Sequence, residues 1–508
     1  MLEDHYRYKW LPTYNYESWW DEIAGHLGAV YPFYNCDSQW KFYLKISDIV
    51  SLRKKNALPL EIDTVSIASI LSKRYILGDR TLLKGVSRAP WMARLMPEGR
   101  WEGFSLPPHQ QLRPQRDLFA EKLKEALIEE VIAYIGSAKT VGLLLSGGMD
   151  SRIAAAVIKD VQKLTDYSFN VITLTWGMEK TRDVVYARQI ARIFNWENIH
   201  FPLSRESLAE NIEYAGKMGA EVSPFHLHAL PQVAAVSGVD VFLAASYGDS
   251  VGRGEFSGSH LCKLRPILPK RWNRFSPLKS DFVDSCKPVL VNDVNNATQR
   301  FNFSPGTIRQ YEIEQEMFYM RRMLQSCMSL VAQQAHFYQI FTAPKVFGMM
   351  WALSPMVRDD SWYGDLLSIL PGRLLDIPWA RSGRIYQGEK SALDNLSRYH
   401  HCYGPWFRQE FRSRVEACVH SSFLHGLGIF NVPALKSLIN IWTKAKTVSI
   451  NALDELFSWM LAFEVFIKEY GISIDPNPQQ CLFKDQFLSL QGRLEAEIFI
   501  RARNALRG

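Results

Sequence analysis

The residues best suited to chemistry form a short run, Ser146-Gly-Gly-Met-Asp-Ser151, directly after the apolar segment Val141–Leu145. Glycines permit a tight turn and let backbone N–H groups approach an anion without obstruction by Cβ atoms. The hydroxyls of Ser146 and Ser151 suit phosphate oxygens, and a helix that starts here adds the partial positive charge of its N-terminus. Asp150 would repel a phosphate directly, so its presence indicates a bridging Mg²⁺. The run therefore predicts a phosphate or pyrophosphate site.

Strands and helices alternate around this run. The expected strands are 141–145, 171–176, 199–203 and 239–245, and the expected helices are 117–135, 150–161 and 183–194. Short unbroken apolar runs are typical of strands covered on both faces, and their alternation with helices favours a parallel α/β sheet. The phosphate site then lies at the carboxyl edge of that sheet. The loop differs from a Walker A loop, because the chain contains no G-x-x-x-x-G-K-[ST] sequence.

The regions on either side of the sheet show other patterns. Residues 1 to about 104 are aromatic-rich, with weak alternation and no long helical period, and the Pro- and Gln-rich stretch 105–116 predicts a linker. Beyond about residue 265 the pattern is mostly helical, most clearly over 312–330, 345–353, 407–419 and 452–468. We therefore predict two domains, one over 1–115 and one over 116–508.

Composition excludes several classes of protein. The 508 residues are 47% hydrophobic and 22% charged, which is globular composition and excludes a disordered or collagen-like chain. The net charge of +7 is spread along the chain, so we expect no nucleic-acid binding. The charged N-terminus does not resemble a secretory signal, and the longest apolar stretches are too short to span a membrane. We expect a soluble cytoplasmic protein, and an oligomer is compatible with this composition.

Cysteines and histidines give no clear metal signature. The seven cysteines are scattered and never spaced C-x-x-C, so neither a disulfide framework nor a zinc module fits. His400-His401-Cys402 and the pair His226 and His228 carry ligating side chains. Without a matching second pair at a recognisable spacing, we expect no metal site from these residues.

The run at 146–151 resembles the PP-loop of ATP pyrophosphatases, and the pattern downstream is similar to the C-terminal domain of asparagine synthetases. Supporting segments are Leu174-Thr-Trp-Gly-Met178, the helix opened by Asp183, and Asn198-Ile-His200. Upstream, 75–88 is similar to the segment that joins the two domains of that family. The resemblance implies an adenine nucleotide alpha hydrolase-like fold with a mostly helical C-terminal extension. It also implies that 1–115 is a short, truncated α+β domain.

This resemblance implies ATP and Mg²⁺ as cofactors. Family members activate a carboxylate by attack on the α-phosphate, giving an acyl-adenylate and pyrophosphate, and an amine then displaces AMP. Asp150 would bind Mg²⁺, the loop would cradle the phosphates, and the backbone near the first two strands would hold adenosine. The positions that carry over to nucleotide binding are Leu144, Ser146, Gly147, Gly148, Asp150, Ser151, Trp176 and Gly248.

Further catalytic positions are implied by the same resemblance. Asp249 matches the second metal-binding aspartate of the family, whereas Ser246 and Ser250 replace its acidic neighbours. If one residue is deleted in the comparison, Tyr247 falls near the position of the catalytic tyrosine in the related β-lactam synthetases. The alternative interpretation is a tyrosine that only packs at the end of the strand. The proline turn 376–386 carries basic residues near the position of the family's catalytic lysine. These residues are Arg381 and Arg384, with Lys390 a little later.

The acceptor and the nitrogen source differ from those of asparagine synthetases. The acceptor motif R-x-P-F-[LI]-D is replaced by Gln339-Ile-Phe-Thr-Ala-Pro344, so we expect a small-molecule, peptide or sugar carboxylate other than aspartate. Residue 2 is leucine instead of the nucleophilic cysteine, and a loop at 146 leaves too little chain for a glutaminase domain of about 200 residues. We therefore expect free ammonia, ammonia from a partner enzyme, or a substrate amine, as in β-lactam synthetases and lasso-peptide cyclases.

Two other functions remain open at this point. Gly248-Asp-Ser-Val-Gly252 has the form of a nucleophile elbow after a strand, with Ser250 as nucleophile and Asp359 and His400 in the required order. That hydrolase hypothesis leaves the run at 146–151 unexplained, and no HGGG-type segment precedes it. The departures at Ser246, Ser250 and Gly383 also fit a degenerate synthetase that binds ATP without turnover.

Overall fold

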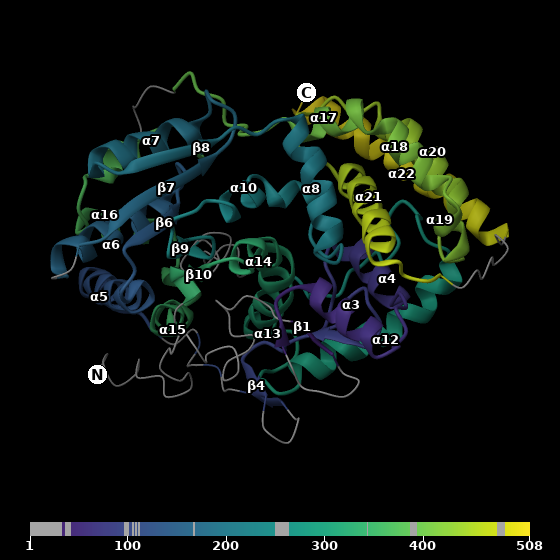
Figure 1. Ribbon diagram of the computed structural model, residues 1–508, viewed down its shortest axis with the longest axis horizontal. Helices are drawn as coiled ribbons and strands as arrows, with labels where there is room; N and C mark the ends of the chain where they lie inside the picture. Colours follow the sequence, from purple (N-terminus) through teal and green to yellow (C-terminus); the bar gives the residue numbers. More distant parts are fainter. Residues whose placement is uncertain are drawn as a thin grey trace.

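A parallel sheet of five strands forms one half of the molecule, and helices form most of the other half (Figure 1). The computed structural model describes residues 33–35, 42–95, 101–103, 106, 109, 112–165, 168–248, 264–342, 344–386, 394–474 and 483–507. The strands lie in the order β10-β9-β6-β7-β8, and all neighbouring pairs are parallel. Their bounds are β6 (Thr140–Leu144), β7 (Asn170–Trp176), β8 (Glu197–Phe201), β9 (Val241–Ala244) and β10 (His336–Gln339). The predicted parallel α/β sheet is therefore confirmed.

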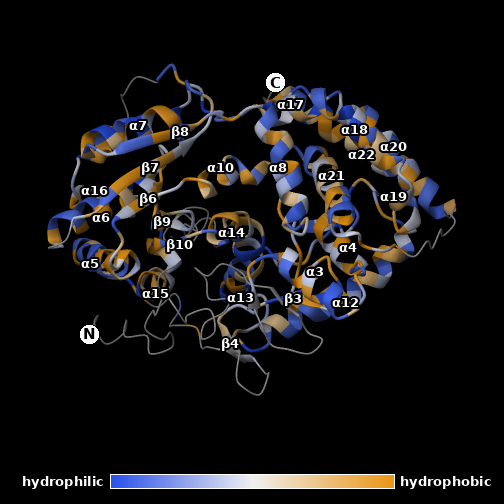
Figure 2. Ribbon diagram, viewed as in Figure 1, coloured by the Kyte–Doolittle hydropathy of each residue, from blue (hydrophilic) through white to orange (hydrophobic). Residues whose placement is uncertain are grey.

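The helices beside the sheet follow the sequence prediction to within a few residues. They are α5 (Arg116–Ile135), α6 (Met149–Leu164) and α7 (Arg182–Phe194). α7 packs on β7 and β8, whereas α5, α6 and α16 (Ser361–Ser368) pack against one another. Figure 2 shows hydrophobic residues concentrated along β6 and β7, in the centre of this half. Because β6 lies between β7 and β9, Val141 and Leu143 are fully buried.

The structure differs from the sequence prediction in the helical regions. The helix expected over 312–330 is three consecutive segments: α13 (Ile308–Glu314), a π-helix η2 (Gln315–Gln325) and α14 (Ser326–Ala332). The helix expected over 407–419 is broken at Phe411 into α17 (Tyr403–Glu410) and α18 (Arg412–Val419). β10 is a strand in a region expected to be mostly helical, and its backbone hydrogen bonds are made to β9.

The described part of the N-terminal region, residues 33–35, 42–95 and 101–103, combines short strands with two helices. β1 (Phe33–Asn35) pairs antiparallel with β2 (Phe42–Tyr43) and β3 (Val86–Arg88), and β4 (Ala93–Leu95) pairs with β5 (Trp101–Gly103). The helices are α3 (Ile46–Lys55) and α4 (Thr64–Lys73), each ten residues long. The sequence showed no long helical period here, yet both helices form because they bury apolar faces, Ile49 and Ile67 among them, in the common core.

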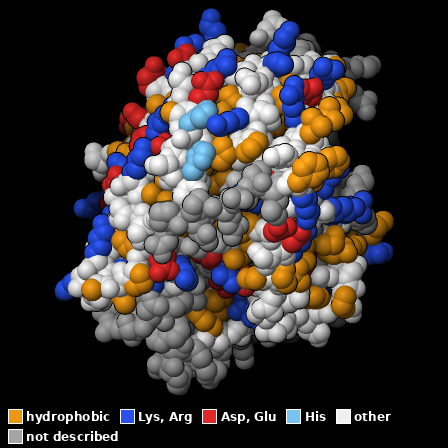
Figure 3. Space-filling model, turned by 90° about the vertical axis from the view of Figure 1, so that its right-hand side faces the viewer, with side chains coloured by type: hydrophobic (Ala, Val, Ile, Leu, Met, Phe, Trp, Pro, Cys, Tyr) orange, Lys and Arg blue, Asp and Glu red, His pale blue; other side chains and the backbone are white. Residues whose placement is uncertain are grey.

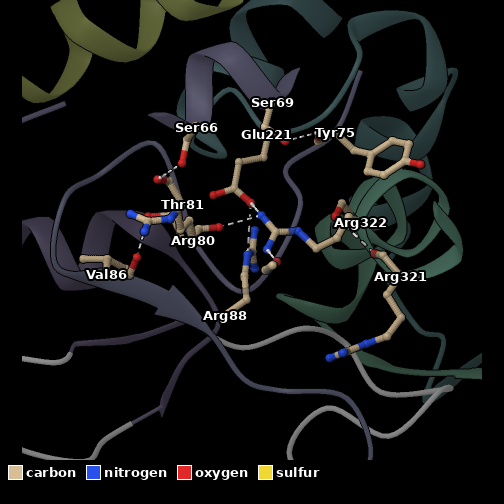
Figure 4. Close-up of polar contacts among 12 residues, drawn as sticks. Ser66, Ser69, Tyr75, Arg80, Thr81, Val86, Arg88, Glu221, Arg321 and Arg322 are labelled. Carbon is tan, nitrogen blue, oxygen red and sulfur yellow. Dashed lines mark hydrogen bonds and ion pairs between the residues drawn. The ribbon is translucent and has the colours of Figure 1, made fainter. Parts of the chain in front are cut away.

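A buried network of arginines joins this N-terminal part to the rest of the chain (Figure 4). Glu221 lies between two guanidinium groups, with its Oε2 3.2 Å from Arg88 Nε and 3.0 Å from Arg322 Nη2. Arg322 also donates to the carbonyls of Gly78 and Arg80. These side chains are almost completely buried, so removal of Glu221 would leave two buried charges without their carboxylate.

The predicted linker is anchored to the body at the positions that the structure describes. Leu112 exchanges two backbone hydrogen bonds, accepting from Ser354 and donating to Ala352, each at 2.8 Å. His109 is buried, with its Nε2 2.5 Å from Glu312 Oε2. The division into domains at residue 115 stays a prediction.

The remaining helices build most of the other half of the molecule, where α21 packs against α8, but α15 and η3 pack against α5, and η5 packs against α16, in the half that holds the sheet. They are α8 (Arg205–Lys217), α9 (Pro224–Leu227), α10 (Leu230–Ala234), α12 (Ser280–Thr298), α15 (Pro344–Ala352), α19 (Ser422–Gly426), α20 (Val432–Trp442), α21 (Ala452–Tyr470), α22 (Phe483–Arg507), and the short 3₁₀ turns η3 (Ile340–Thr342), η4 (Pro355–Val357) and η5 (Leu374–Asp376). The outer face of this half exposes hydrophobic side chains among its charges (Figure 3), several of them on α22. None of the described helices has the length and apolar character needed to cross a membrane.

Candidate nucleotide-binding site

The loop between β6 and α6 is held in shape by its own serines. Ser151 Oγ contacts the Ser146 carbonyl at 2.9 Å, the Gly148 carbonyl at 3.1 Å and the Ser146 hydroxyl at 3.1 Å. Ser146 Oγ accepts from the Gly148 N–H at 3.2 Å. Gly148 is the N-cap of α6 and offers no capping side chain, so the first turn of this 16-residue helix points its backbone N–H groups at the loop. That arrangement suits an anion at the helix N-terminus.

A buried arginine fixes a second segment against this loop. Arg152 is fully buried, and its guanidinium donates to the Gly147 carbonyl at 3.0 Å. On the other side it donates to the carbonyls of Leu374 at 2.9 Å, Ile377 at 2.7 Å and Pro378. Burial lowers the pKa of Arg152 to about 10, which leaves the group charged at neutral pH. The proline turn 376–386 is thereby held against the serine–glycine loop.

Gly147 is required by this contact. The Ala380 N–H donates to the Gly147 carbonyl at 3.2 Å, and a Cβ at Gly147 would lie 2.9 Å from Ala380 Cβ and 3.1 Å from the Arg182 carbonyl. No real Cβ sits that close to a neighbouring Cβ without displacing it. The glycine therefore serves the approach of the turn to the loop.

Asp150 lies in the first turn of α6, opposite two groups from distant parts of the chain. The Tyr363 hydroxyl, on α16, donates to Asp150 Oδ1. A Cβ added at Gly248 would stand only 2.3 Å from the same oxygen, so the backbone after β9 approaches the carboxylate closely. A carboxylate at a helix N-terminus is placed to hold Mg²⁺ beside a bound phosphate.

One cavity of about 270 Å³ gathers most of the predicted nucleotide residues. It opens at the carboxyl ends of β6, β7 and β9. Its lining residues are Leu144, Leu145, Ser146, Gly148, Asp150, Ser151, Trp176, Asp183, Ala244, Ala245, Ser246, Met328 and His400. Six of the eight predicted positions belong to this lining; the other two are Gly147, packed against Ala380, and Gly248, packed against Asp150. The ligating groups present, hydroxyls and carboxylates beside the N-terminus of a helix, fit a magnesium nucleotide.

The comparison with known protein families bears on the same part of the chain. Residues 122–343 match the family described as Asparagine synthase. This span is an asparagine synthase domain. It begins within α5, contains all five strands of the sheet and ends just after η3. A search of curated proteins found no match to the chain.

The asparagine synthase domain implies ATP-dependent amide-forming chemistry, and the site uses residues beyond the matched span. Three parts of the site lie beyond residue 343. Tyr363 contacts Asp150, the turn 376–386 contacts the loop, and His400 lines the cavity. Figure 1 shows the chain returning from the helical half to the sheet and back again through the segment before α17. The site is therefore built by the domain together with part of the helical extension.

The structure does not bring the predicted catalytic residues together in the cavity lining that it describes. Tyr247 is fully buried, and its hydroxyl donates to the Met320 carbonyl at 3.0 Å, so it does not line the cavity. Arg381 and Arg384 are exposed on the turn and also lie outside the cavity lining. Asp249 lies outside the described residues, as do Ser250 and Lys390. The roles assigned to all of these residues stay predictions.

The hydrolase hypothesis gains no support from the described residues. Asp359 is exposed and accepts from the Ser361 N–H at 2.9 Å, while His400 belongs to the nucleotide cavity. The candidate nucleophile itself, Ser250, is among the residues that the structure does not describe.

Several residues of the site were not among the predicted nucleotide-binding or catalytic positions. Ser246 lines the cavity, and its backbone N–H donates to the buried Gln339 Oε1 at 2.9 Å, which ties β9 to β10 at the cavity edge. Asp183 brings a second carboxylate into the lining. Arg152 and Tyr363 carried no motif at all.

Proposed function

We propose that this chain activates a carboxylate with Mg²⁺ and ATP, releases pyrophosphate, and transfers the acyl group from AMP to an amine. The observation that carries the proposal is the cavity at the strand ends, which collects the loop hydroxyls, Asp150 and Trp176 within an asparagine synthase domain. In this reaction the carboxylate oxygen attacks the α-phosphorus, the bond to pyrophosphate breaks, and the amine then displaces AMP.

The chemistry asked of the protein is charge stabilisation on the leaving pyrophosphate. Helix α6 presents its N–H groups to the phosphates, and Asp150 provides the carboxylate for Mg²⁺, with Asp249 as a second ligand in our proposal. Mg²⁺ would supply Lewis-acid stabilisation of the phosphate oxygens. Arg381 and Arg384 stand on the turn that Arg152 holds against the loop, and a guanidinium stays charged at every physiological pH. We assign them to the outgoing pyrophosphate.

We further propose that the nitrogen comes from ammonia, free or from a partner enzyme, or from an amine on the substrate. A glutaminase domain that uses a cysteine nucleophile needs an activated thiol. Burial raises the pKa of Cys286 to about 11 and those of Cys327 and Cys418 to about 12, and it also raises the pKa of Cys402. None of the described cysteines is therefore poised as a thiolate nucleophile.

The acceptor is a carboxylate other than aspartate in this proposal, from a small molecule, a peptide or a sugar acid. The support is chemical: by the resemblance, Gln339 replaces the acceptor arginine, and its Oε1 accepts from the Ser246 backbone N–H. An amide cannot replace an arginine as the partner of an acceptor carboxylate.

Pyrophosphate release tests the proposal. The full chain with Mg²⁺ and ATP is screened against carboxylic acids from these three classes, each with and without ammonium. We expect release that depends on one carboxylate class and that is lost in Asp150→Asn. Binding of ATP without release from any acid would contradict the enzyme and favour a degenerate, nucleotide-binding protein.

A further inference from the structure

Three histidines from two distant segments meet beside the nucleotide cavity. His228 ends α9, whereas His400 and His401 precede α17. One ring nitrogen from each lies within 4.8 Å of the other two. The ring centroids are 5.1 Å apart for His228 and His400, 5.6 Å for His228 and His401, and 4.5 Å for His400 and His401. In the sequence these histidines belong to two separate groups, the pair His226 and His228 and the run His400-His401-Cys402. The fold brings the two groups together.

We propose that His228, His400 and His401 bind a transition-metal ion of the zinc class, with a fourth position open toward the nucleotide cavity. Three imidazoles and one open position are the ligand set of exchangeable Zn²⁺ sites. Ring nitrogens select Zn²⁺, Co²⁺, Ni²⁺ or Cu²⁺ over Mg²⁺, which prefers oxygen. This ion is therefore distinct from the Mg²⁺ assigned to Asp150, and the inference does not rest on the proposed function.

The surroundings leave lone pairs available for such an ion. Nδ1 of His228 is buried, and among the described residues it has no hydrogen-bond partner. A buried polar atom without a partner is rare in native structures and calls for an unseen ligand. Nδ1 of His401 accepts a long contact of 3.3 Å from the Tyr403 N–H.

Two neighbouring groups with metal-ligating chemistry contact other side chains. His226 Nε2 lies 3.9 Å from Glu455 Oε1. The Cys402 thiol points to the sulfur of Met178 at 3.8 Å. The site is therefore one of three nitrogens, without sulfur.

The position of the cluster couples it to the nucleotide cavity. His400 lines that cavity, and the His228 ring lies parallel to the Trp176 ring at 6.2 Å. Trp176 and His400 both belong to the cavity lining. A ligand in the cavity can therefore offer a nitrogen or oxygen to the fourth position of the ion, which water occupies otherwise.

Metal titration of the full chain tests this inference. The chain is prepared without a polyhistidine tag, stripped with a chelator and kept reduced, and Co²⁺ and Zn²⁺ are titrated by visible absorption and calorimetry. We expect one equivalent to bind, with at least tenfold weaker binding in His228→Asn and in His401→Asn, which change separate segments. His425→Asn, at an exposed histidine on α19, is the matched control and should bind as the parent does. Binding that is absent in the parent, or unchanged in both variants, would overturn the site.

A second measurement needs no variant. X-ray absorption at the zinc edge should show imidazole nitrogens at about 2.0–2.1 Å. Sulfur scattering at about 2.3 Å would overturn the three-nitrogen assignment. Addition of Mg²⁺ with a non-hydrolysable ATP analogue should change the Co²⁺ spectrum; an unchanged spectrum would contradict a fourth position that opens on the cavity.

Discussion

The hydroxyl of Tyr363 donates to the carboxylate of Asp150, although the two residues stand 213 positions apart in the chain. Tyr363 is 4% exposed and lies on α16, so its ring is fixed by packing before any ligand arrives. This hydrogen bond holds one oxygen of a carboxylate that belongs to the cavity lining. Groups that orient a metal ligand in this way typically change metal affinity 10–100-fold when they are removed.

The first prediction concerns that bond. Tyr363→Phe keeps the ring and removes only the hydroxyl, so we expect the Mg²⁺ concentration for half-maximal pyrophosphate release to rise about 10-fold to 100-fold. Tyr470→Phe, which removes a hydroxyl bonded to the Lys217 carbonyl on α8, is the matched control and should leave it unchanged. An unaltered Mg²⁺ dependence in Tyr363→Phe would show that this hydroxyl has no effect on Mg²⁺ binding.

The second prediction concerns the glycine opposite Asp150. In Gly248→Ala the new Cβ would meet Asp150 Oδ1 at 2.3 Å and its Cβ at 2.9 Å, so the carboxylate must move. We expect ATP-dependent turnover to fall by at least tenfold, with a loss of unfolding free energy of about 1–3 kcal/mol. Gly426→Ala meets its nearest neighbour at an ordinary 3.4 Å and should change neither quantity. Full activity in Gly248→Ala would show that the carboxylate position is unimportant.

The third prediction concerns the buried guanidinium between loop and turn. Lysine cannot reach both the Gly147 carbonyl and the carbonyls of the turn, so Arg152→Lys leaves buried acceptors unsatisfied. We expect a loss of about 2–4 kcal/mol, measured as a lower urea midpoint at unchanged slope. The exposed change Arg412→Lys should stay within about 0.5 kcal/mol of the parent. A similarly small change at Arg152 would mean that the turn is held by other contacts.

The sequence predicted the sheet and its loop because both depend on local signals. An apolar strand, two glycines and a helix start within eleven residues determine the geometry of 141–151, and the structure differs there by only one or two residues. The cavity lining followed for the same reason, since parallel strands bring their carboxyl ends to one edge. The resemblance to the asparagine synthase domain rested on these same segments.

The contacts that complete the site could not be predicted, because they join distant segments. Nothing local marks Tyr363 as the partner of Asp150, or His228 as the neighbour of His400, until the helical half folds back on the sheet. The strand β10 has four residues and takes its identity from pairing with β9. The π-helix η2 interrupts a stretch whose apolar spacing is still helical, so periodicity alone shows a single helix.

The fourth prediction concerns a buried acid in that π-helix. Burial, with Glu312 nearby, raises the pKa of Glu316 well above 4.5, and its Oε2 is buried without a hydrogen-bond partner among the described residues. Above pH 4.5 the unfolded carboxyl is ionised while the folded one stays protonated, so this group makes stability fall as pH rises. Glu316→Gln removes that loss. We expect its stability relative to the parent to improve by up to about 1.4 kcal/mol per pH unit between about pH 5.5 and about pH 7.5.

Chemical unfolding at the two pH values checks this prediction. Glu410→Gln, at an exposed side chain, is the matched control and should stay within about 0.5 kcal/mol of the parent at both. A Glu316→Gln difference that does not grow with pH would show that the carboxyl ionises in the folded protein.

The central claim is that ATP is cleaved between its α- and β-phosphates at the cavity beside Asp150. Phosphorus NMR of the products, in a reaction with Mg²⁺, ATP, ammonium and the carboxylate panel, tests it most directly. We expect AMP and pyrophosphate in equal amounts, and loss of both in Asp150→Asn. Formation of ADP and phosphate instead, or AMP production that survives Asp150→Asn, would contradict the account.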